Sequence, residues 1–324
     1  MKILIATPLY PPDIGGPAQY AFNLEREFQK LGHEIRVIKF SEVKHWPSGI
    51  RHFFYFFKLL PAMFWTDWCL ILVTFSVGLP SVMVGRLLGK KTIIRTGGDF
   101  LWENYVERTS KLILLRNFYQ TGIPSFNFKE RLIFRLIRWI LRQVNFVVFS
   151  TNWQRQIWMG PYKLDLARTA IIENYYGTKL PAVEVEGQVF LSAGRNLKLK
   201  NFDILKSLNF VFEIGQWPLE KLTEKIKNCY ALVAPSVSEI SPNIILEAVR
   251  YNKPFILTKE NGIRDRLNDI GVYINPLDPA DIGEKLLWLS GKINYNTQIK
   301  KISNFNFLHS WSEMAQEFLD LVKL

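Results

Sequence analysis

Two glutamates separated by seven residues, Glu239 and Glu247, give the clearest chemical signal in the chain. They follow an apolar, strand-like stretch and lead into an apolar helix, so Glu239 falls in a loop and Glu247 inside the helix. Carboxylates accept hydrogen bonds from hydroxyl groups. The pair could therefore bracket a bound nucleotide from its sugar to its ribose.

The start of that helix is a predicted phosphate site. Ser241 is expected to be the N-cap and Pro242 the first helical residue, because serine and proline favour these positions. The first backbone N–H groups of a helix have no partner inside the helix and attract phosphate. In this chain those groups belong to Asn243, Ile244 and Ile245.

Further motifs precede the two glutamates in the sequence. Gly194-Arg195 is followed by Lys200, and a proline- and glycine-rich loop runs from Pro11 to Pro17. Together with the glutamate pair, these motifs resemble the retaining glycosyltransferases of family four, which have the GT-B fold. The resemblance covers nearly the whole chain, and its remaining pieces are Gly32-His33-Glu34-Ile35, Gly98-Asp99, Trp102-Glu103, Asn174 and Ser310-Trp311.

The resemblance implies a role for each catalytic candidate. Arg195 and Lys200 would neutralise the diphosphate of a sugar nucleotide, and Glu247 would accept the ribose hydroxyls. Glu239 would hold the donor sugar and support the positive charge that develops at its anomeric carbon. Asp99 would bind a sugar hydroxyl or orient the acceptor, with Glu103 a weaker candidate. The nucleotide-sugar-binding positions, besides Glu247, would be Gly15, Gly16, Gly194, Ser241, Asn243 and Ile244.

Strands and helices alternate along the sequence, which predicts parallel sheets and an α/β fold. We expect two doubly wound, Rossmann-like domains facing a cleft: residues 1–182 bind the acceptor and residues 183–305 bind the nucleotide sugar. Residues 306–324 form a helix that begins with the capping box Ser310 and Glu313 and packs back on the first domain. The short distance from Lys200 to Glu239 predicts that the second sheet is one strand short. The predicted strands are 2–6, 34–39, 69–73, 91–95, 146–150 and 170–173, then 188–193, 210–214, 231–235, 254–258 and 272–274.

The expected activity is transfer of a hexose-type sugar from a UDP- or GDP-sugar to a lipid-linked, glycan or small-molecule acceptor. No cofactor and no metal are expected, because basic side chains would replace a cation and the four histidines are scattered. The alternative is a catalytically silent GT-B protein that binds nucleotides or serves as a scaffold. A Rossmann oxidoreductase is disfavoured, because the first strand is not followed by Gly-x-Gly-x-x-Gly.

The net charge of +12 is concentrated in the first half, where residues 45–160 hold 15 Lys and Arg against 5 Asp and Glu. An aromatic cluster spans residues 53–65, and a helix presents four arginines on one face: Arg131, Arg135, Arg138 and Arg142. This bias favours an anionic membrane surface as a partner, with an ordinary solvated face as the alternative. No nucleic-acid-binding module is recognisable.

Several features favour a cytoplasmic protein, with peripheral attachment to the inner face of the cell membrane. The first residues, Met1 to Ala6, have the pattern of a buried strand and not of a signal peptide. The uncharged stretch from Trp68 to Gly85 is divided by glycine and proline, so strand, loop and helix are expected in place of a membrane span. Cys69 and Cys229 match no metal spacing and are expected to be buried free thiols.

Overall fold

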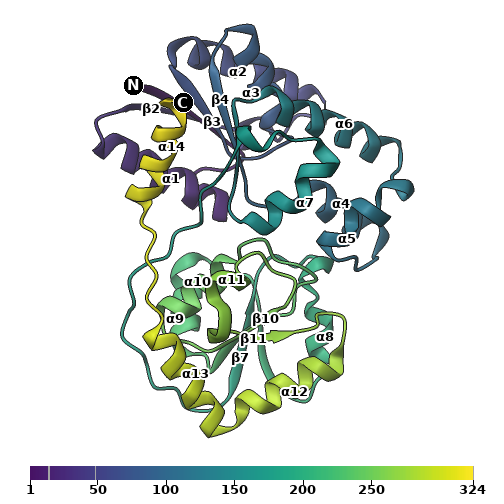
Figure 1. Cartoon of the computed structure of the whole chain (residues 1–324), viewed down its shortest axis with the longest axis vertical. Coiled ribbons are helices and arrows are strands. Elements are labelled where there is room, and N and C mark those ends of the chain that lie inside the picture. The colour runs from purple at the N-terminus through teal and green to yellow at the C-terminus, as the bar shows by residue number, and fades with distance from the viewer. Residues whose placement is uncertain (14, 48, 324) are drawn as a thin grey trace. The chain divides into compact units, whose positions relative to one another are not determined.

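The computed structural model describes residues 1–13, 15–47 and 49–323. The chain forms two compact units, each built on a parallel sheet (Figure 1). Unit 1 comprises Met1–Leu101, Ile123–Asn174 and Ser310–Leu324, and unit 2 comprises Trp102–Gly122 and Tyr175–His309. The predicted α/β class with two parallel sheets is confirmed. The predicted domains divide the chain by sequence position, whereas the units divide it by contacts, and residues 102–122 fall in unit 2.

Unit 1 contains a six-stranded parallel sheet in the order β2-β1-β3-β4-β5-β6. The chain therefore leaves β1 in one direction and later returns past it, as doubly wound sheets do. Strand β1, which lies between β2 and β3, has five buried residues in a row, since both faces of the sheet are covered by helices. The strands are β1 (Lys2–Thr7), β2 (Glu34–Lys39), β3 (Trp68–Ile71), β4 (Lys91–Thr96), β5 (Phe146–Phe149) and β6 (Thr169–Ile171).

The helices of unit 1 form two groups. The C-terminal helix α14 packs against α1 (Figure 1). Trp311 meets Tyr20 edge to face there, with ring centroids 5.4 Å apart. The other group contacts in series, α2 with α3, α3 with α6 and α6 with α7. The bounds are α1 (Gly16–Lys30), α2 (Ile50–Trp65), α3 (Gly78–Leu87), α6 (Phe128–Gln143), α7 (Asn152–Tyr162) and α14 (Trp311–Lys323), with 3-10 turns at Phe40–Val43 (η1), Ile123–Ser125 (η2) and Leu166–Arg168 (η3).

Two local predictions in unit 1 are confirmed. The Ser310 hydroxyl accepts from the Glu313 N–H at 3.1 Å, and the Glu313 carboxylate accepts from the Ser310 N–H at 2.6 Å, which is a capping box. The uncharged stretch after residue 68 forms β3, a loop and α3. Within the described residues, no helix combines the length and apolarity needed to cross a bilayer.

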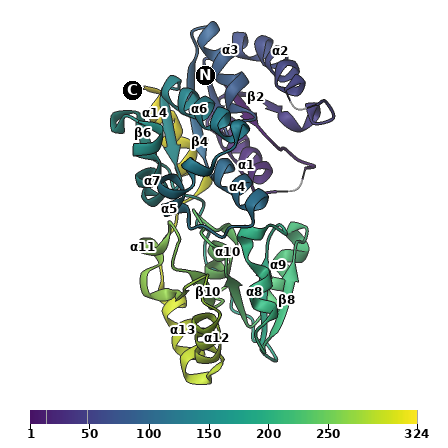
Figure 2. The same ribbon diagram turned by 90° about the vertical axis from the view of Figure 1, so that its right-hand side faces the viewer.

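Unit 2 contains a five-stranded parallel sheet in the order β11-β10-β9-β7-β8. The five strands agree with the shortened second sheet that the sequence predicts. Edge strand β8 lies beside α9 (Figure 2). The strands are β7 (Val189–Ala193), β8 (Val211–Gly215), β9 (Ala231–Ala234), β10 (Phe255–Thr258) and β11 (Val272–Ile274).

The helices of unit 2 cover both faces of this sheet and include a segment from the first half of the chain. That segment, residues 102–122, holds most of α4 (Phe100–Thr109) and all of α5 (Leu115–Thr121). The remaining helices are α8 (Phe202–Lys206), α9 (Leu219–Asn228), α10 (Asn243–Arg250), α11 (Arg264–Leu267), α12 (Pro279–Ser290) and α13 (Lys292–Asn304), with 3-10 turns at Lys198–Lys200 (η4) and Asn268–Ile270 (η5).

Cys69 and Cys229 are buried free thiols, as predicted. Burial raises the pKa of both groups, that of Cys229 to about 12. Neither thiol therefore has the thiolate character that makes a cysteine reactive.

Candidate functional site

The candidate site lies where the strand order of unit 2 reverses. From β7 the chain moves outward to β8 and then crosses back to β9 on the other side of β7. In doubly wound sheets, ligands bind beside the carboxyl ends of the two strands at this switch point. Arg195 and Lys200 follow β7, and Glu239 follows β9, so the topology carries these side chains to the same edge.

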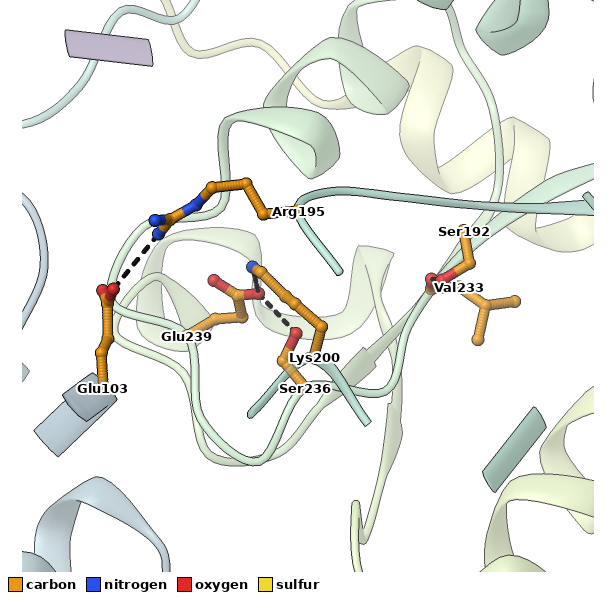
Figure 3. Close-up of polar contacts among 7 residues, drawn as sticks. All are labelled: Glu103, Ser192, Arg195, Lys200, Val233, Ser236 and Glu239. Atoms are coloured by element: carbon orange, nitrogen blue, oxygen red, sulfur yellow. Dashed lines mark hydrogen bonds and ion pairs between the residues drawn. The ribbon is translucent and has the colours of Figure 1, made fainter. Parts of the chain in front are cut away.

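The two strands begin to separate at this edge. β7 and β9 pair only through Phe190 with Ala231 and Leu191 with Leu232. One residue later, the Ser192 hydroxyl donates to the Val233 carbonyl at 2.7 Å (Figure 3). A side chain therefore links the strands where the backbone ladder ends, and the loops beyond it can diverge around a ligand.

Lys200 and Glu239 meet directly. The Lys200 ammonium donates to Glu239 Oε1 at 2.5 Å, and the Ser236 hydroxyl donates to the same oxygen at 2.6 Å (Figure 3). The side chains of Lys200 and Glu239 are only 21% and 13% exposed. Because both charges are largely removed from water, each depends on the other for compensation. The sequence did not indicate Ser236, which fixes the position of the carboxylate.

The loop that carries Glu239 is held by the loop after β10. The Glu239 N–H donates to the Glu260 carbonyl at 2.9 Å, and the Gly262 N–H donates to the Glu239 carbonyl at 3.0 Å. A parallel bridge joins Glu239 to Asn261. The carboxylate is therefore presented by a loop with fixed backbone partners on both sides of the peptide.

The predicted start of the following helix is wrong by one residue. Pro242, and not Ser241, is the N-cap, with extended backbone (φ −73°, ψ 102°), and α10 begins at Asn243. The chain stays extended here because it has only just left the loop paired at Glu239. Ile245 also leaves the predicted set of donors, since its N–H bonds to the Pro242 carbonyl at 3.0 Å. Asn243 and Ile244 remain in the first turn.

Glu247 lies in the middle of α10, as predicted. Its carboxylate is 3.6 Å from Arg250, and its side chain is 33% exposed. Burial raises the pKa of Glu247 above its ordinary value, and the positive charge of Arg250 offsets part of this increase. The carboxylate therefore lies in partly apolar surroundings where a hydroxyl donor would be favourable.

Arg195 faces the carboxylate of Glu103, which was only a weak candidate from the sequence. The Arg195 Nη2 is 3.2 Å from Glu103 Oε2 (Figure 3). Glu103 belongs to the segment of residues 102–122 that joins unit 2. Arg195 is 62% exposed, so this ion pair is weak and exchangeable. A phosphate approaching Arg195 would compete with Glu103 for the same donors.

The same segment is fixed to unit 2 by further contacts. The Lys198 N–H donates to the Glu107 carboxylate at 2.6 Å, and the Leu115 N–H donates to the Ser238 hydroxyl at 3.0 Å. Arg116 Nε lies 2.5 Å from Glu260, whose side chain is only 6% exposed. These contacts span both the β7 and β9 loops. Nothing in the local sequence pattern of residues 102–122 indicates this position.

The candidate glycines occupy different settings. In unit 2, the Gly194 N–H donates to the Gly215 carbonyl at 3.0 Å, which joins the ends of β7 and β8. In unit 1, Gly15 precedes α1 with φ 149°, a conformation that favours glycine, and Gly16 is the first residue of α1. Gly15 and Gly16 thus start a helix at the carboxyl end of β1, where doubly wound sheets bind ligands.

Asp99 follows β4 in unit 1 and is only 1% exposed. Its Oδ2 accepts a hydrogen bond from the Trp158 indole N–H at 2.9 Å. The Gln154 amide donates to the neighbouring Gly98 carbonyl at 3.3 Å. In this arrangement Asp99 anchors the loop before α4 and is covered by protein.

The sequence of unit 2 matches the model of a known protein family. Residues 179–292 match the sequence model of the family described as Glycosyl transferases group 1. No curated protein matches the sequence. The matched region contains all the unit 2 candidates outside residues 102–122.

Solved structures resemble the whole chain at low identity. Sucrose-phosphate synthase from Thermosynechococcus elongatus is 12% identical, with 99% of this chain and 98% of that chain covered and a TM-score of 0.70. WaaG, a glycosyltransferase involved in lipopolysaccharide biosynthesis, is 12% identical, with 99% of both chains covered and a TM-score of 0.68. HepE from Anabaena in complex with UDP is 11% identical, with 100% of both chains covered and a TM-score of 0.61.

The geometry of unit 2, the matched region and the structural relatives agree with the resemblance that the sequence motifs indicated. The two parallel-sheet units have the architecture of these relatives over nearly their full length. The chain thus has the GT-B fold, and residues 179–292 of its second unit match the family Glycosyl transferases group 1.

Proposed function

We propose that this protein is a retaining, metal-independent glycosyltransferase that moves a hexose-type sugar from a UDP- or GDP-sugar to a lipid-linked, glycan or small-molecule acceptor in the cytoplasm. The observation that carries the proposal is the Lys200–Glu239 contact of 2.5 Å at the switch point of unit 2. The pair lies beyond the carboxyl ends of β7 and β9, and doubly wound sheets bind nucleotides at such a position, which supports the proposal.

In the proposed reaction, Lys200 and Arg195 neutralise the donor diphosphate. Their interaction strengthens as the bond between the anomeric carbon and the phosphate oxygen breaks and charge moves to the phosphate. The first turn of α10 adds backbone donors from Asn243 and Ile244. Glu247 accepts the ribose hydroxyls.

Glu239 supports the opposite charge. As the donor bond breaks, positive charge develops at the anomeric carbon, and a nearby carboxylate stabilises it. The acceptor oxygen attacks from the same face and forms the new bond, and its proton passes to the departing phosphate oxygen. This sequence of events retains the anomeric configuration and requires no protein base.

Ligand binding gives the first test. HepE was solved with UDP, so UDP and GDP are the first ligands to screen by thermal shift. A nucleotide that binds only the folded state raises the unfolding temperature. Release of nucleoside diphosphate from a matching sugar nucleotide would then show turnover. Activity should persist in chelator, and a loss restored by magnesium or manganese would contradict the metal-independent mechanism.

A catalytically silent nucleotide-binding protein is the second candidate. Two observations favour it, the five-stranded sheet of unit 2 and the Glu103 carboxylate on Arg195. The same experiment separates the two functions. Nucleotide binding without turnover of any sugar nucleotide, with and without candidate acceptors, would favour the silent protein.

A further inference from the structure

Helix α2 is apolar on two opposite faces. One face packs into unit 1 through Tyr55, Leu59, Ala62 and Met63, all buried. The opposite face is exposed and follows the helical spacing i, i+3, i+4, i+7 and i+14. We call it the α2 outer face, and it consists of Ile50, Phe53, Phe54, Phe57 and Phe64. A contiguous apolar face that is left exposed marks a site of interaction, so the outer face calls for a partner.

The exposure of this face is large. Phe53 is 61% exposed, Phe57 50% and Phe64 76%. The Phe53 and Phe57 rings contact one another with centroids 4.6 Å apart, and Trp46 stacks on Phe54 at 4.4 Å. Because the Phe53 and Phe54 rings also contact, with centroids 6.2 Å apart, these four rings form one contiguous apolar ridge outside the core.

The segment that carries the ridge has charges of a single sign. Residues 44–65 contain Lys44, Arg51 and Lys58 but no Asp or Glu. Lys58 is paired with Glu42 in η1. At the end of the helix, the Arg36 guanidinium lies 4.2 Å from the centroid of the Trp65 ring. Cations beside aromatic rings are typical of protein surfaces that meet anionic headgroups.

The neighbouring helices α3 and α6 also expose apolar or basic side chains. α3 lies beside α2 in both views and contacts it (Figure 1, Figure 2). It exposes Met83 and Leu87, 46% and 67%, together with Arg86. In α6, which contacts α3, Arg135 and Arg142 are exposed.

The arginine face predicted for α6 needs a correction. Arg138 is only partly exposed, and its guanidinium donates to the Pro161 carbonyl, at 3.0 Å from Nε. Arg131 likewise donates from Nε to the Phe126 carbonyl at 3.0 Å. Both guanidinium groups therefore stabilise neighbouring segments through backbone carbonyls. Arg135 and Arg142 are the α6 arginines suited to a surface role.

We propose that the α2 outer face inserts into the headgroup region of an anionic bilayer, with the cations around it contacting lipid phosphates. A second copy of the chain fits less well, because pairing this face with itself would bring like charges together. This inference rests on the proposed function, since the α2 outer face would bring the transferase to a lipid-linked acceptor. Its test is vesicle binding, which does not depend on turnover.

The first experiment measures co-sedimentation with vesicles of phosphatidylcholine alone and of an equimolar mixture with phosphatidylglycerol. The unaltered chain should bind the mixed vesicles and bind less at high salt, because salt screens the headgroup attraction. Phe53→Ser with Phe57→Ser should weaken binding by about tenfold or more, since apolar insertion is lost. Both side chains are half exposed or more, so the unfolding temperature should stay unchanged.

A matched control lies in unit 2. Leu287 and Ile293 are apolar and 69% and 82% exposed, like the phenylalanines of the α2 outer face, but they belong to unit 2. Leu287→Ser with Ile293→Ser should leave vesicle binding unchanged. Equal losses from the two double variants would overturn the proposal. A dimer at micromolar concentration, abolished by the α2 double variant while vesicle binding is absent, would identify a second copy as the partner instead.

A second experiment reports insertion directly. Cys69 and Cys229 are 0% and 3% exposed and have raised pKa values, so a new surface cysteine can be labelled selectively. A polarity-sensitive dye on Phe57→Cys should shift to the blue with mixed vesicles. The same dye on Leu287→Cys should not shift. An unchanged Phe57→Cys spectrum, with the protein bound to vesicles, would show that another surface makes the contact.

Discussion

Cationic side chains are used differently in two regions of this molecule. At the switch point of unit 2, Arg195 and Lys200 each lie against a carboxylate, at 3.2 and 2.5 Å. Around the α2 outer face of unit 1, arginines and lysines surround exposed phenylalanines in a stretch without acids. The first arrangement suits a small anion that displaces a carboxylate. The second suits a broad anionic and apolar surface.

The unit 2 cations also differ from one another. Lys200 is 21% exposed and its partner Glu239 is 13% exposed, whereas Arg195 is 62% exposed. Water screens an exposed pair but not a buried one. Removing Lys200 should therefore disturb the site more than removing Arg195.

The largest effect is expected for Lys200→Ala. It removes a donor to the developing phosphate charge and leaves Glu239 without its ammonium partner, so turnover should fall by roughly 10²-fold or more. Single-turnover rates with the donor identified by thermal shift measure this loss. Arg195→Ala is the matched variant and should also lose rate, but less. A Lys200→Ala rate close to that of the unaltered chain would remove the proposed clamp.

The glutamate pair should separate binding from transfer. Glu239→Gln should slow transfer by about 10-fold or more with little change in nucleotide affinity, because in the proposed mechanism only Glu239 faces the reacting sugar. Glu247→Gln should chiefly weaken nucleotide binding. Titration calorimetry with the nucleoside diphosphate and single-turnover rates give the two quantities. Equal changes in both quantities for both variants would show that the roles are divided wrongly.

Glu247 also predicts a pH effect on stability. Burial raises its pKa above the ordinary 4.5, so the folded chain retains this proton at pH values where the unfolded chain has lost it. This carboxyl therefore lowers stability as pH rises from about its ordinary pKa through the raised one. Glu247→Gln should raise the unfolding temperature at neutral pH, and the gain should vanish in acid. A gain that is the same at every pH would assign it to another cause.

Asp99→Ala tests the buried contact in unit 1. The substitution leaves the Trp158 indole N–H without its acceptor in a buried position, which costs about 1–3 kcal/mol. Denaturant unfolding of the intact chain measures the cost. Asp99→Asn keeps an oxygen that can accept this bond and should be milder. A variant with unchanged stability but lost turnover would return Asp99 to a direct role in acceptor binding.

The smallest effect is expected for Glu103→Gln. The variant frees Arg195 from an exposed ion pair worth about 0–1 kcal/mol, so nucleotide affinity should rise by less than about fivefold. The increase should shrink at high salt, because salt already weakens the pair. Glu107→Gln removes a neighbouring negative charge, whose carboxylate accepts from the Lys198 N–H, and serves as the control because the glutamine oxygen can keep that bond. Reduced affinity in Glu103→Gln alone would mean that Glu103 helps to position Arg195 for the ligand.

Local pattern was sufficient for most of the fold. Apolar runs such as residues 231–234 and the alternation of strands and helices predicted both sheets, including the five strands of unit 2. Ser310 and Glu313 predicted their capping box, since its partners are three residues apart. The α10 start was misplaced by one residue because the loop before it is held extended by the distant β10 loop.

The candidate site was predictable only in part. The motifs named Lys200, Glu239 and Arg195, because such residues follow strands at recognisable positions. They gave no indication that the Ser236 hydroxyl shares an oxygen of Glu239 with Lys200. Likewise, the sequence indicated aromatic and basic residues in the first half but not which of them are exposed. Arg138, for example, lies on the predicted basic face, but its guanidinium donates to the Pro161 carbonyl.

The order of elements, the carboxyl-end positions of the candidate residues and the excess of positive charge in the first half could all be read from the amino-acid sequence. These properties depend on neighbours a few positions apart. That residues 102–122 join unit 2, and that Glu103 meets Arg195, 92 positions away, depends on the folded arrangement. The same holds for the α2 outer face, because exposure depends on what the rest of the fold leaves uncovered. Contacts between distant segments are set by how the sheets carry those segments, and no local pattern records that placement.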